Sequence, residues 1–429
     1  MSSSRPLTRR SVLAGLGGTA LAAGLAACGR GGSGGTTGSL QFLLLGPTPA
    51  LLTLFKDKLI PAFRKQEGIE VQLQTSDWGS GFQKVLTAAA SHALPDVLTV
   101  GGIWTAPLVS KGALGRLDEH LKSWSARTSY YPGYLKDCQY KGHTYALPVY
   151  ADVRTVAYRA DLFERAGLDP DKPPTTWDEY RAYAEKLVRK KGGRIVTEGA
   201  DWFIDTSIGL QQSFAQLMLQ AGGTYYKPDG KANFASAEGL RALEYLVSFF
   251  ADGLSSVDVV NKPTSPAPLV AGSAAMAFTN MSVLANAKAN DAEVLPKIKA
   301  GPPLATRAGA KPVTSAWVNK FAMSATTKNP EGAWKWLAFV SEKANLGTLD
   351  AEYGFIPPRK DLAHAAFLHD VDTDFITASE HVVPQPPNPQ MLEIAQVINT
   401  QLQRAVRRQA KPADVLETID TKVDALTGA

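Results

Sequence analysis

Cysteine and histidine are scarce in this chain, and their scarcity excludes several kinds of site. The 429 residues include two cysteines, Cys28 and Cys138, and six histidines. Two cysteines exclude a disulfide scaffold and a cysteine-rich zinc or iron–sulfur site, and the scattered histidines form no H-E-x-x-H pattern. We therefore expect neither a metal nor a cofactor.

Excess charge of one sign is also missing. Lys and Arg total 45 against 40 Asp and Glu, and residues 1–27 contain three Arg and no acid, which leaves 42 against 40 for the rest of the chain. A nucleic-acid partner requires a basic face, so this balance argues against one. The composition, 45% apolar, is that of a globular protein, and the length predicts two or three domains at about 100 to 200 residues each.

Long hydrophobic runs are absent except near the N-terminus. An uncharged run of about 16 residues, Val12 to Ala27, follows Arg9 and Arg10 and is shorter than the ~20 residues that span a bilayer. We interpret residues 1–27 as an export signal, with the arginine pair resembling the twin-arginine type. The tetrad that ends at Cys28 resembles the bacterial lipobox, in which the cysteine is acylated; an incidental thiol in a leader is the alternative.

Residues 28–39 are rich in Gly and Ser and are typical of a flexible tether. With an acylated Cys28 before it, this tether predicts a folded body held by lipid at the extracytoplasmic face of the cell membrane.

Apolar periodicity in the body alternates between strands and helices. The run Leu40 to Leu45 predicts a strand, and a helix is expected after it up to Phe63. A strand at 69–74, a helix at 82–91 and the strand VLTV at 97–100 follow. Thr176 to Glu179 form a capping box, and two amphipathic helices are expected at the C-terminus. This succession predicts an α/β fold with mainly parallel sheets flanked by helices.

Nine segments in the body, taken together and in order, resemble the extracellular solute-binding proteins of ABC importers, specifically the carbohydrate-binding group that includes maltose-binding protein. They are LIPAFRKQEGIEV (59–71), SHALPDVLTV (91–100), KGALGRLDEHL (111–121), YKGHTYALPVYAD (140–152), YRADLFERAGLDPDKPPTTWDEY (158–180), FASAEGLRALEYL (234–246), VAGSAAMAF (270–278), TTKNPEGAWKWLAFV (326–340) and YGFIPPRKDL (353–362).

The resemblance implies a two-lobed periplasmic-binding-protein-like fold with a hinge of two or three segments and ligand trapped between the lobes. We expect lobe 1 at 40–155 plus 320–355 and lobe 2 at 158–317 plus 358–429, with crossings near 155–158, 316–323 and 353–358. It also implies a monomer without catalysis that delivers a carbohydrate to ABC permease subunits. No P-loop is present, so ATP hydrolysis belongs to a partner.

Aromatic side chains are the first candidates for a sugar site, because sugars offer apolar C–H faces ringed by hydroxyls. Trp78, Trp104, Trp202 and Trp317 lie after expected strands or in loops, where open α/β sheets bind ligands, although each could equally be a core or surface residue. Trp124, Trp177, Trp334 and Trp336 lie in helical stretches and are expected to pack in the protein.

Polar candidates gather near the first crossing. Tyr150, Asp152 and Arg154 alternate along one strand and so share a face, where Asp could accept from sugar hydroxyls and Arg could donate. A surface ion pair of Asp152 with Arg154 is the alternative. Phe278 and Asn280 follow another expected strand, and Tyr353 lies at the third crossing, where it could instead be a hinge residue.

Other functions stay open at this point. Arg154 departs from the family pattern, which expects a small or apolar residue there, and so leaves room for an acidic or polyol solute such as a sugar phosphate. The abundant carboxylates do not exclude a secreted glycoside hydrolase. A structural surface adhesin would show no closing motion and no stabilisation by a small molecule.

Overall fold

The apolar run at the start of the body forms an interior strand of a five-stranded sheet. The computed structural model describes residues 38–204, 208–259, 266–368 and 373–429, which all belong to one compact unit. The first sheet has the strand order β2-β1-β3-β12-β6. Its strands are β1 (Ser39–Leu45), β2 (Glu70–Ser76), β3 (Val97–Val100), β6 (Ala146–Val153) and β12 (Ala316–Met323).

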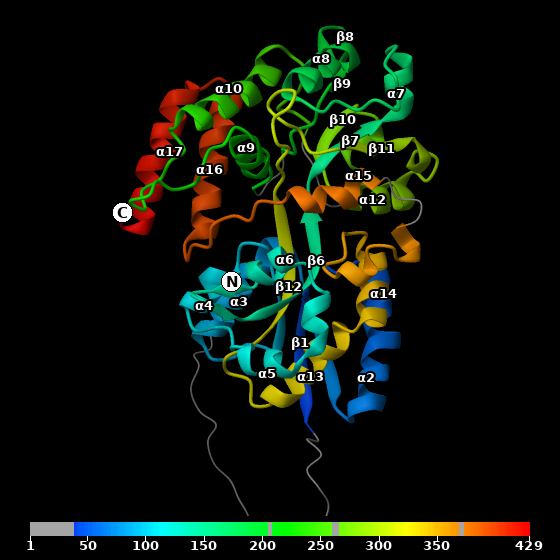
Figure 1. Cartoon of the computed structure of the whole chain (residues 1–429), viewed down its shortest axis with the longest axis vertical. Helices are drawn as coiled ribbons and strands as arrows, with labels where there is room; N and C mark the ends of the chain where they lie inside the picture. Colours follow the sequence, from blue (N-terminus) through cyan, green and yellow to red (C-terminus); the bar gives the residue numbers. More distant parts are fainter. Residues whose placement is uncertain (1–37, 205–207, 260–265, 369–372) are drawn as a thin grey trace, which may run out of the picture. The chain divides into compact units, whose positions relative to one another are not determined.

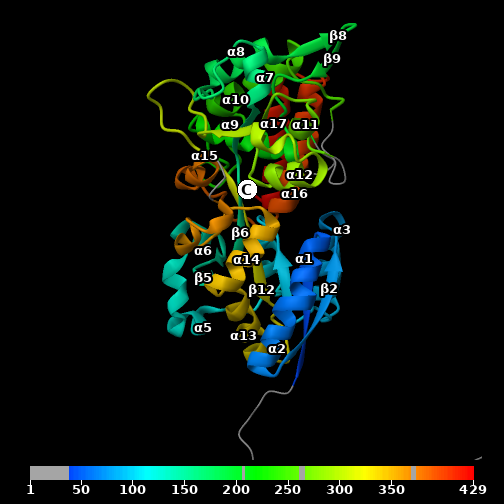
Figure 2. The ribbon, with the colours of Figure 1, turned by 90° about the vertical axis from the view of Figure 1, so that its right-hand side faces the viewer.

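Helices cover this sheet and complete what we call the first half. Phe42 of β1 packs edge-on against Phe321 of β12 and Trp336 of α13, in a core that all three segments share. Helices α2, α13 and α14 lie beside the sheet in both views (Figure 1, Figure 2). The helices of the first half are α1 (Pro49–Leu54), α2 (Ile60–Glu67), α3 (Trp78–Ala90), α4 (Thr105–Ser110), α5 (Asp118–Ser123), α6 (Pro132–Asp137), α13 (Pro330–Val340) and α14 (Lys343–Tyr353), with a π-helical turn at Phe55–Leu59.

A second sheet, of order β10-β7-β11, organises what we call the second half. Its strands are β7 (Thr155–Arg159), β10 (Met276–Thr279) and β11 (Ile298–Gly301). Its helices are α7 (Ala160–Arg165), α8 (Trp177–Leu187), α9 (Gly209–Gln220), α10 (Ala237–Ala251), α11 (Pro268–Ala271), α12 (Ser282–Asn290), α15 (Thr373–Thr377), α16 (Met391–Val406) and α17 (Pro412–Thr427). Thr176 caps α8 through the expected capping box.

Short elements complete the fold. Two-stranded ribbons are formed by β4 (Gln139–Tyr140) with β5 (His143–Thr144) and by β8 (Arg189–Lys191) with β9 (Arg194–Thr197). Single 3-10 turns lie at Ser125–Ser129, Leu295–Lys297, Lys360–Leu362, Ala366–Leu368 and Ala378–His381. In the described parts of the chain, no helix is both long enough and apolar enough to cross a bilayer.

The expectation of mainly parallel sheets is wrong. In the first sheet β1 runs parallel to β2 and β3, but β12 runs antiparallel to both β3 and β6. In the second sheet β7 is antiparallel to both described neighbours. The apolar period of a strand is the same in either direction, so the sequence pattern could not reveal this.

The strand pairing also shows that the chain passes between the halves at positions other than expected for the second and third crossings. All of β12 pairs within the first sheet, so the chain has returned to the first half by Ala316. Leu362 packs in the core of the first half, and Arg359 donates to the Ser341 carbonyl at 2.8 Å, so the third crossing follows Leu362. The first crossing is shorter than expected, because Arg154 alone separates β6 from β7.

Candidate functional site

The residue between β6 and β7 is the centre of a buried polar cluster. The Arg154 guanidinium donates from Nε to Asp152 Oδ1 at 3.0 Å and from Nη2 to Asp152 Oδ2 at 3.2 Å. Nη2 also donates to Gln212 Oε1 of α9 at 2.9 Å. The Arg154 side chain is 7% exposed and that of Asp152 15%. The expected pair therefore exists, but it is buried rather than on the surface.

Groups from both halves hold this cluster. Asn280, which follows β10, donates from Nδ2 to Asp152 Oδ1 at 2.6 Å. The Arg154 guanidinium carbon lies 4.5 Å from the ring centre of Phe203 and 5.4 Å from that of Trp317 on β12. Its backbone carbonyl accepts from the Thr314 hydroxyl. Asp152, Arg154, Asn280 and Trp317 are thus four candidates that the fold brings together.

A row of tryptophans continues from this cluster into the first half. A Cβ on Gly102 would lie 2.8 Å from Trp317 Cβ, and a Cβ on Gly101 would lie 3.0 Å from the Trp104 ring. Trp104 in turn packs edge-on against Trp78, with ring centres 5.5 Å apart. Trp104 and Trp317 are 6% and 5% exposed, whereas Trp78 is 37% exposed. Only Trp78 of the three therefore offers a large open surface.

The start of α3 fixes the position of Trp78. Asp77 caps this helix by accepting from the Ser80 backbone N–H at 2.8 Å, so Trp78 is its first residue. Gly46, at the end of β1, has φ +58°, and any Cβ there would overlap the Trp78 indole. A glycine that allows both the left-handed turn and the close approach of the ring thus sets the orientation of Trp78.

A cavity of about 390 Å³ adjoins this row at Gly102. Its walls come from both halves: the loop that enters α4, the turn of β4 and β5, and residues 384–388 with Met391. Thr105 and Gln385, one from each half, are among its lining residues, and the Thr105 hydroxyl and the Gln385 amide nitrogen are themselves buried with no hydrogen-bond partner among the described residues.

A buried ion pair supports the wall of this cavity. Lys320 of β12, with no exposed side-chain surface, lies 2.6 Å from Asp137 Oδ2 and donates to the Gly102 carbonyl at 3.0 Å. Burial raises the pKa of the Asp137 carboxyl, and the Lys320 ammonium opposes that rise. Lys320 thereby ties α6 to the loop that carries Gly102.

Tyr150 and Tyr353 form a separate aromatic group in the first half. Their ring centres are 4.3 Å apart, and Phe355 stacks on Tyr150 at 4.6 Å. Both tyrosines are under 10% exposed, and burial raises the pKa of Tyr150 well above its ordinary value. They lie in the core of the first half, where they pack between β6 and the end of α14.

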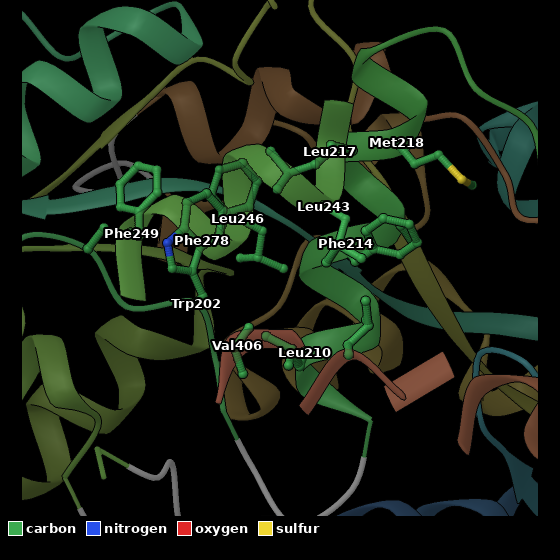
Figure 3. Packing of buried hydrophobic residues seen from close by; sticks show 14 of the residues in the cluster. Trp202, Leu210, Phe214, Leu217, Met218, Leu243, Leu246, Phe249, Phe278 and Val406 are labelled. Carbon is green, nitrogen blue, oxygen red and sulfur yellow. The ribbon is translucent and has the colours of Figure 1, made fainter. Parts of the chain in front are cut away.

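Trp202 and Phe278 lie inside the core of the second half, which corrects their expected place at an open sheet end. Trp202 is 1% exposed and Phe278 2%, and their rings stack with centres 5.6 Å apart. Figure 3 shows both among Leu243, Leu246 and Phe249. Protein covers both faces of these rings, because the segment after Glu198 runs beside β10 and turns its Trp inward. We leave both out of the proposed site.

Sequence reasoning missed Phe203, Gln212, Lys320 and the cavity residues. Phe203 has φ +56°, a conformation rare for a bulky residue, and its N–H donates to Asp201 Oδ1 at 2.8 Å. Gln212 is one of several glutamines on α9 and carries no signal of its own. Cys28 lies outside the described residues, and among the described residues no three metal-ligating side chains gather.

Comparison with known proteins identifies the family. The profile of the bacterial extracellular solute-binding proteins matches residues 49–346. The chain belongs to this family. A solute-binding protein of an ABC transporter from Thermotoga lettingae, solved with α-D-tagatose bound, has a TM-score of 0.81 at 25% identity, over 91% of this chain and 99% of that chain.

Curated relatives of this solute-binding protein span most of its length. A binding protein of Brucella abortus (strain 2308) is 26% identical over 369 residues, 84% of this chain and 86% of that protein. The sn-glycerol-3-phosphate-binding periplasmic protein of Escherichia coli (strain K12) is 25% identical over 359 residues, 76% of this chain and 77% of that protein. The family resemblance and the α/β periplasmic-binding-protein fold are confirmed, and a glycoside hydrolase is set aside because this is a family of binding proteins.

Proposed function

We propose that this solute-binding protein captures a carbohydrate between its two halves and delivers it to the membrane subunits of an ABC importer. The observation that carries the proposal is the cavity of about 390 Å³, whose lining includes Thr105 on one half and Gln385 on the other, with a hydroxyl and an amide nitrogen that have no hydrogen-bond partner among the described residues. A ligand with several hydroxyls could satisfy both groups at once and so hold the halves together.

The volume and surroundings of the cavity fit this chemistry. Small-molecule sites usually measure about 300 to 1,000 Å³ and combine apolar walls with a few placed polar groups. Here Gly102 joins the cavity to Trp317, and the row of tryptophans ends at the exposed ring of Trp78. An aromatic face beside hydrogen-bonding groups is the combination that a sugar ring requires.

A thermal-shift screen of monosaccharides, oligosaccharides and polyols tests the proposal. A ligand at 100 times its dissociation constant should add about 2.7 kcal/mol to the free energy of unfolding. Calorimetric titration of each hit against the wild type and Thr105→Val follows, because this near-isosteric change removes one unpaired hydroxyl. Equal affinity of the two proteins for every hit would show that the ligand does not bind in this cavity. The absence of any hit would contradict the carbohydrate assignment.

A phosphorylated polyol is the second candidate ligand. The E. coli relative is named for binding sn-glycerol-3-phosphate, and the arginine in the polar cluster is a residue type suited to phosphate. Including sn-glycerol-3-phosphate and hexose phosphates in the same screen distinguishes this candidate from a neutral sugar.

We further propose that the protein is exported through the twin-arginine signal and anchored by lipid on Cys28. The tetrad Leu25 to Cys28 and the Gly/Ser stretch after it support this. Cys28→Ala should release the protein from the membrane fraction or block its maturation, as seen by fractionation and mass spectrometry of the N-terminus. Retention of the variant in the membrane fraction, with the leader cleaved elsewhere, would contradict the anchor.

A further inference from the structure

The wall of the cavity of about 390 Å³ contains cations that no carboxylate neutralises. Among the described lining residues the charged ones are Lys136, Asp137 and Lys141. Asp137 lies 2.6 Å from the Lys320 ammonium, so its charge is already neutralised within the protein. Lys136 and Lys141 are exposed, and neither forms an ion pair in the part of the chain that the structure describes. The positive charge of both lysines is therefore available to an occupant of the cavity.

The ammonium of Lys141 lies beside another residue of the cavity wall. Its Nζ is 5.5 Å from the ring centre of Tyr140, which also lines the cavity. A cation over an aromatic face is attracted only weakly at an exposed site, and an ammonium has three N–H donors. The contact with Tyr140 thus holds the charge at the wall and leaves its hydrogen-bonding capacity for a ligand.

The backbone at Lys141 gives no reason for a lysine at this position. A two-residue turn, Lys141 and Gly142, joins β4 to β5, and its φ angles are +48° and +80°. Turns with positive φ at both positions favour Asn-Gly, Asp-Gly or Gly-Gly, because the Cβ of an ordinary side chain crowds the backbone in the left-handed region. The turn therefore disfavours the very residue that brings a charge to the cavity.

Arg154, the sequence-based candidate for an acidic ligand, is already engaged by the protein. Its guanidinium donates to both oxygens of Asp152 at 3.0 and 3.2 Å, and its side chain is 7% exposed. Arg154 is also not among the described residues that line the cavity. An acidic group in the cavity would therefore meet the two lysines rather than this arginine.

We propose that the ligand of this cavity is a carbohydrate with an acidic group, a carboxylate or a phosphate, to which Lys136 and Lys141 donate. The inference rests on the proposed function and names the ligand class of the same site. Hydrogen bonds from an ammonium to an anionic oxygen are stronger than those between neutral groups. The one carboxylate among the described lining residues, Asp137, is bound to Lys320, so its repulsion of an anionic ligand is offset.

Matched sets of compounds test the proposal by calorimetric titration of the wild type. Each set contains a neutral sugar, its uronate and its 6-phosphate: D-galactose with D-galacturonate and D-galactose 6-phosphate, and the same three forms of D-glucose. Any hit from the thermal-shift screen is added with its own acidic forms. We expect an acidic member to bind about tenfold more tightly than its neutral counterpart, and the tighter of the two acids identifies the group as carboxylate or phosphate. Neutral sugars that bind as tightly as their acidic forms would overturn the inference.

Lys141→Asn is the sharpest variant, because it removes the charge and supplies the residue type that the turn prefers. Combined with Lys136→Gln, it should reduce the preference for the acidic form from about tenfold to less than about twofold. Arg408→Asn is the matched control, since Arg408 is an exposed cation with φ +59° that does not line the cavity. An undiminished preference in the double variant, or an equal loss in Arg408→Asn, would overturn the role of the two lysines.

The same titrations separate a failure of this inference from a failure of the proposed function. A neutral sugar that binds, with no gain from an acidic group, leaves a carbohydrate receptor and overturns the inference alone. Binding of no neutral or acidic sugar contradicts the proposed function, and the inference is overturned with it. An apo melting temperature of Lys141→Asn equal to or above that of the wild type shows that its effect on binding is not a loss of folding.

Discussion

At the scale of single residues, exposure separates the tryptophans that can contact a ligand from those that support the fold. Trp78→Ala should weaken carbohydrate binding by about ten- to a hundredfold, since a large apolar contact is worth about 1.5 to 3 kcal/mol, with little change in apo stability. Trp78 is 37% exposed and Trp104 behind it 6%, so Trp104→Ala should lower apo stability by about 3 to 5 kcal/mol. Calorimetric titration and apo melting curves on both variants measure the two effects. Unchanged affinity in Trp78→Ala would show that the Trp78 ring does not contact the ligand.

A second residue-scale prediction concerns Glu198, which is 2% exposed. Burial, aided by the nearby charge of Asp201, raises the pKa of Glu198 from 4.5 to about 9, against the opposing hydrogen bond from the Ser256 N–H. Below pH 4.5 folded and unfolded chains both hold the proton. Between pH 4.5 and 9 the unfolded chain loses it while the folded chain keeps it, so the free energy of unfolding falls as pH rises.

Glu198→Gln keeps the shape of the side chain and removes the fall in the free energy of unfolding between pH 4.5 and 9. The variant should be more stable than the wild type by about 1 to 3 kcal/mol at pH 7 and nearly equal to it at pH 4. Urea unfolding of both proteins at several pH values gives the comparison. A stability difference that stays constant with pH would show that Glu198 does not carry the proton in the folded state.

At the scale of elements, local signals in the sequence predict where strands and helices lie, but they do not predict which strands pair or in which direction. The Thr176 capping box starts a helix where expected, because this signal acts within four residues. The direction of β12 and its place beside β6 depend on contacts with residues more than 150 positions away, for which the run AWVNKFAM contains no signal. The sequence therefore predicts a crossing within Ala316–Met323, where the structure has a strand of the first sheet.

The loop after β3 is the element that joins the sheet to the cavity, and its packing yields a further prediction. A Cβ on Gly102 would approach the Cβ and the backbone Cα of Trp317 to 2.8 and 3.0 Å, so Gly102→Ala should cost about 1 to 3 kcal/mol of stability and weaken ligand binding. Gly133→Ala on α6 is the control, because a Cβ there meets nothing within 4 Å. Similar melting temperatures for both variants would show that the loop can move away from Trp317.

At the scale of the whole molecule, the site assembles from segments that the chain order separates. Side-chain chemistry, together with the crossings that the family resemblance implies, selects Asp152, Arg154, Asn280 and Trp317, and the fold places them in one cluster. It could not exclude Trp202 and Phe278, because their rings are buried by helices from distant positions. Nor could it select Thr105 or Gln385, since a lone hydroxyl and a lone amide become notable only when both are seen unpaired around one cavity.

Because the proposed ligand touches both halves, its binding should be visible in the dimensions of the molecule. A few crossing segments connect the halves, and a ligand can favour a closed arrangement only by its difference in affinity for the two states. We expect a saturating carbohydrate hit to lower the radius of gyration measured by small-angle X-ray scattering, toward the about 21 Å of a single compact chain of about 400 residues. A non-binding stereoisomer of the same sugar is the control for solvent contrast. Identical scattering with and without a ligand that binds tightly in calorimetry would place the site within one half and remove the cavity between the halves from the proposal.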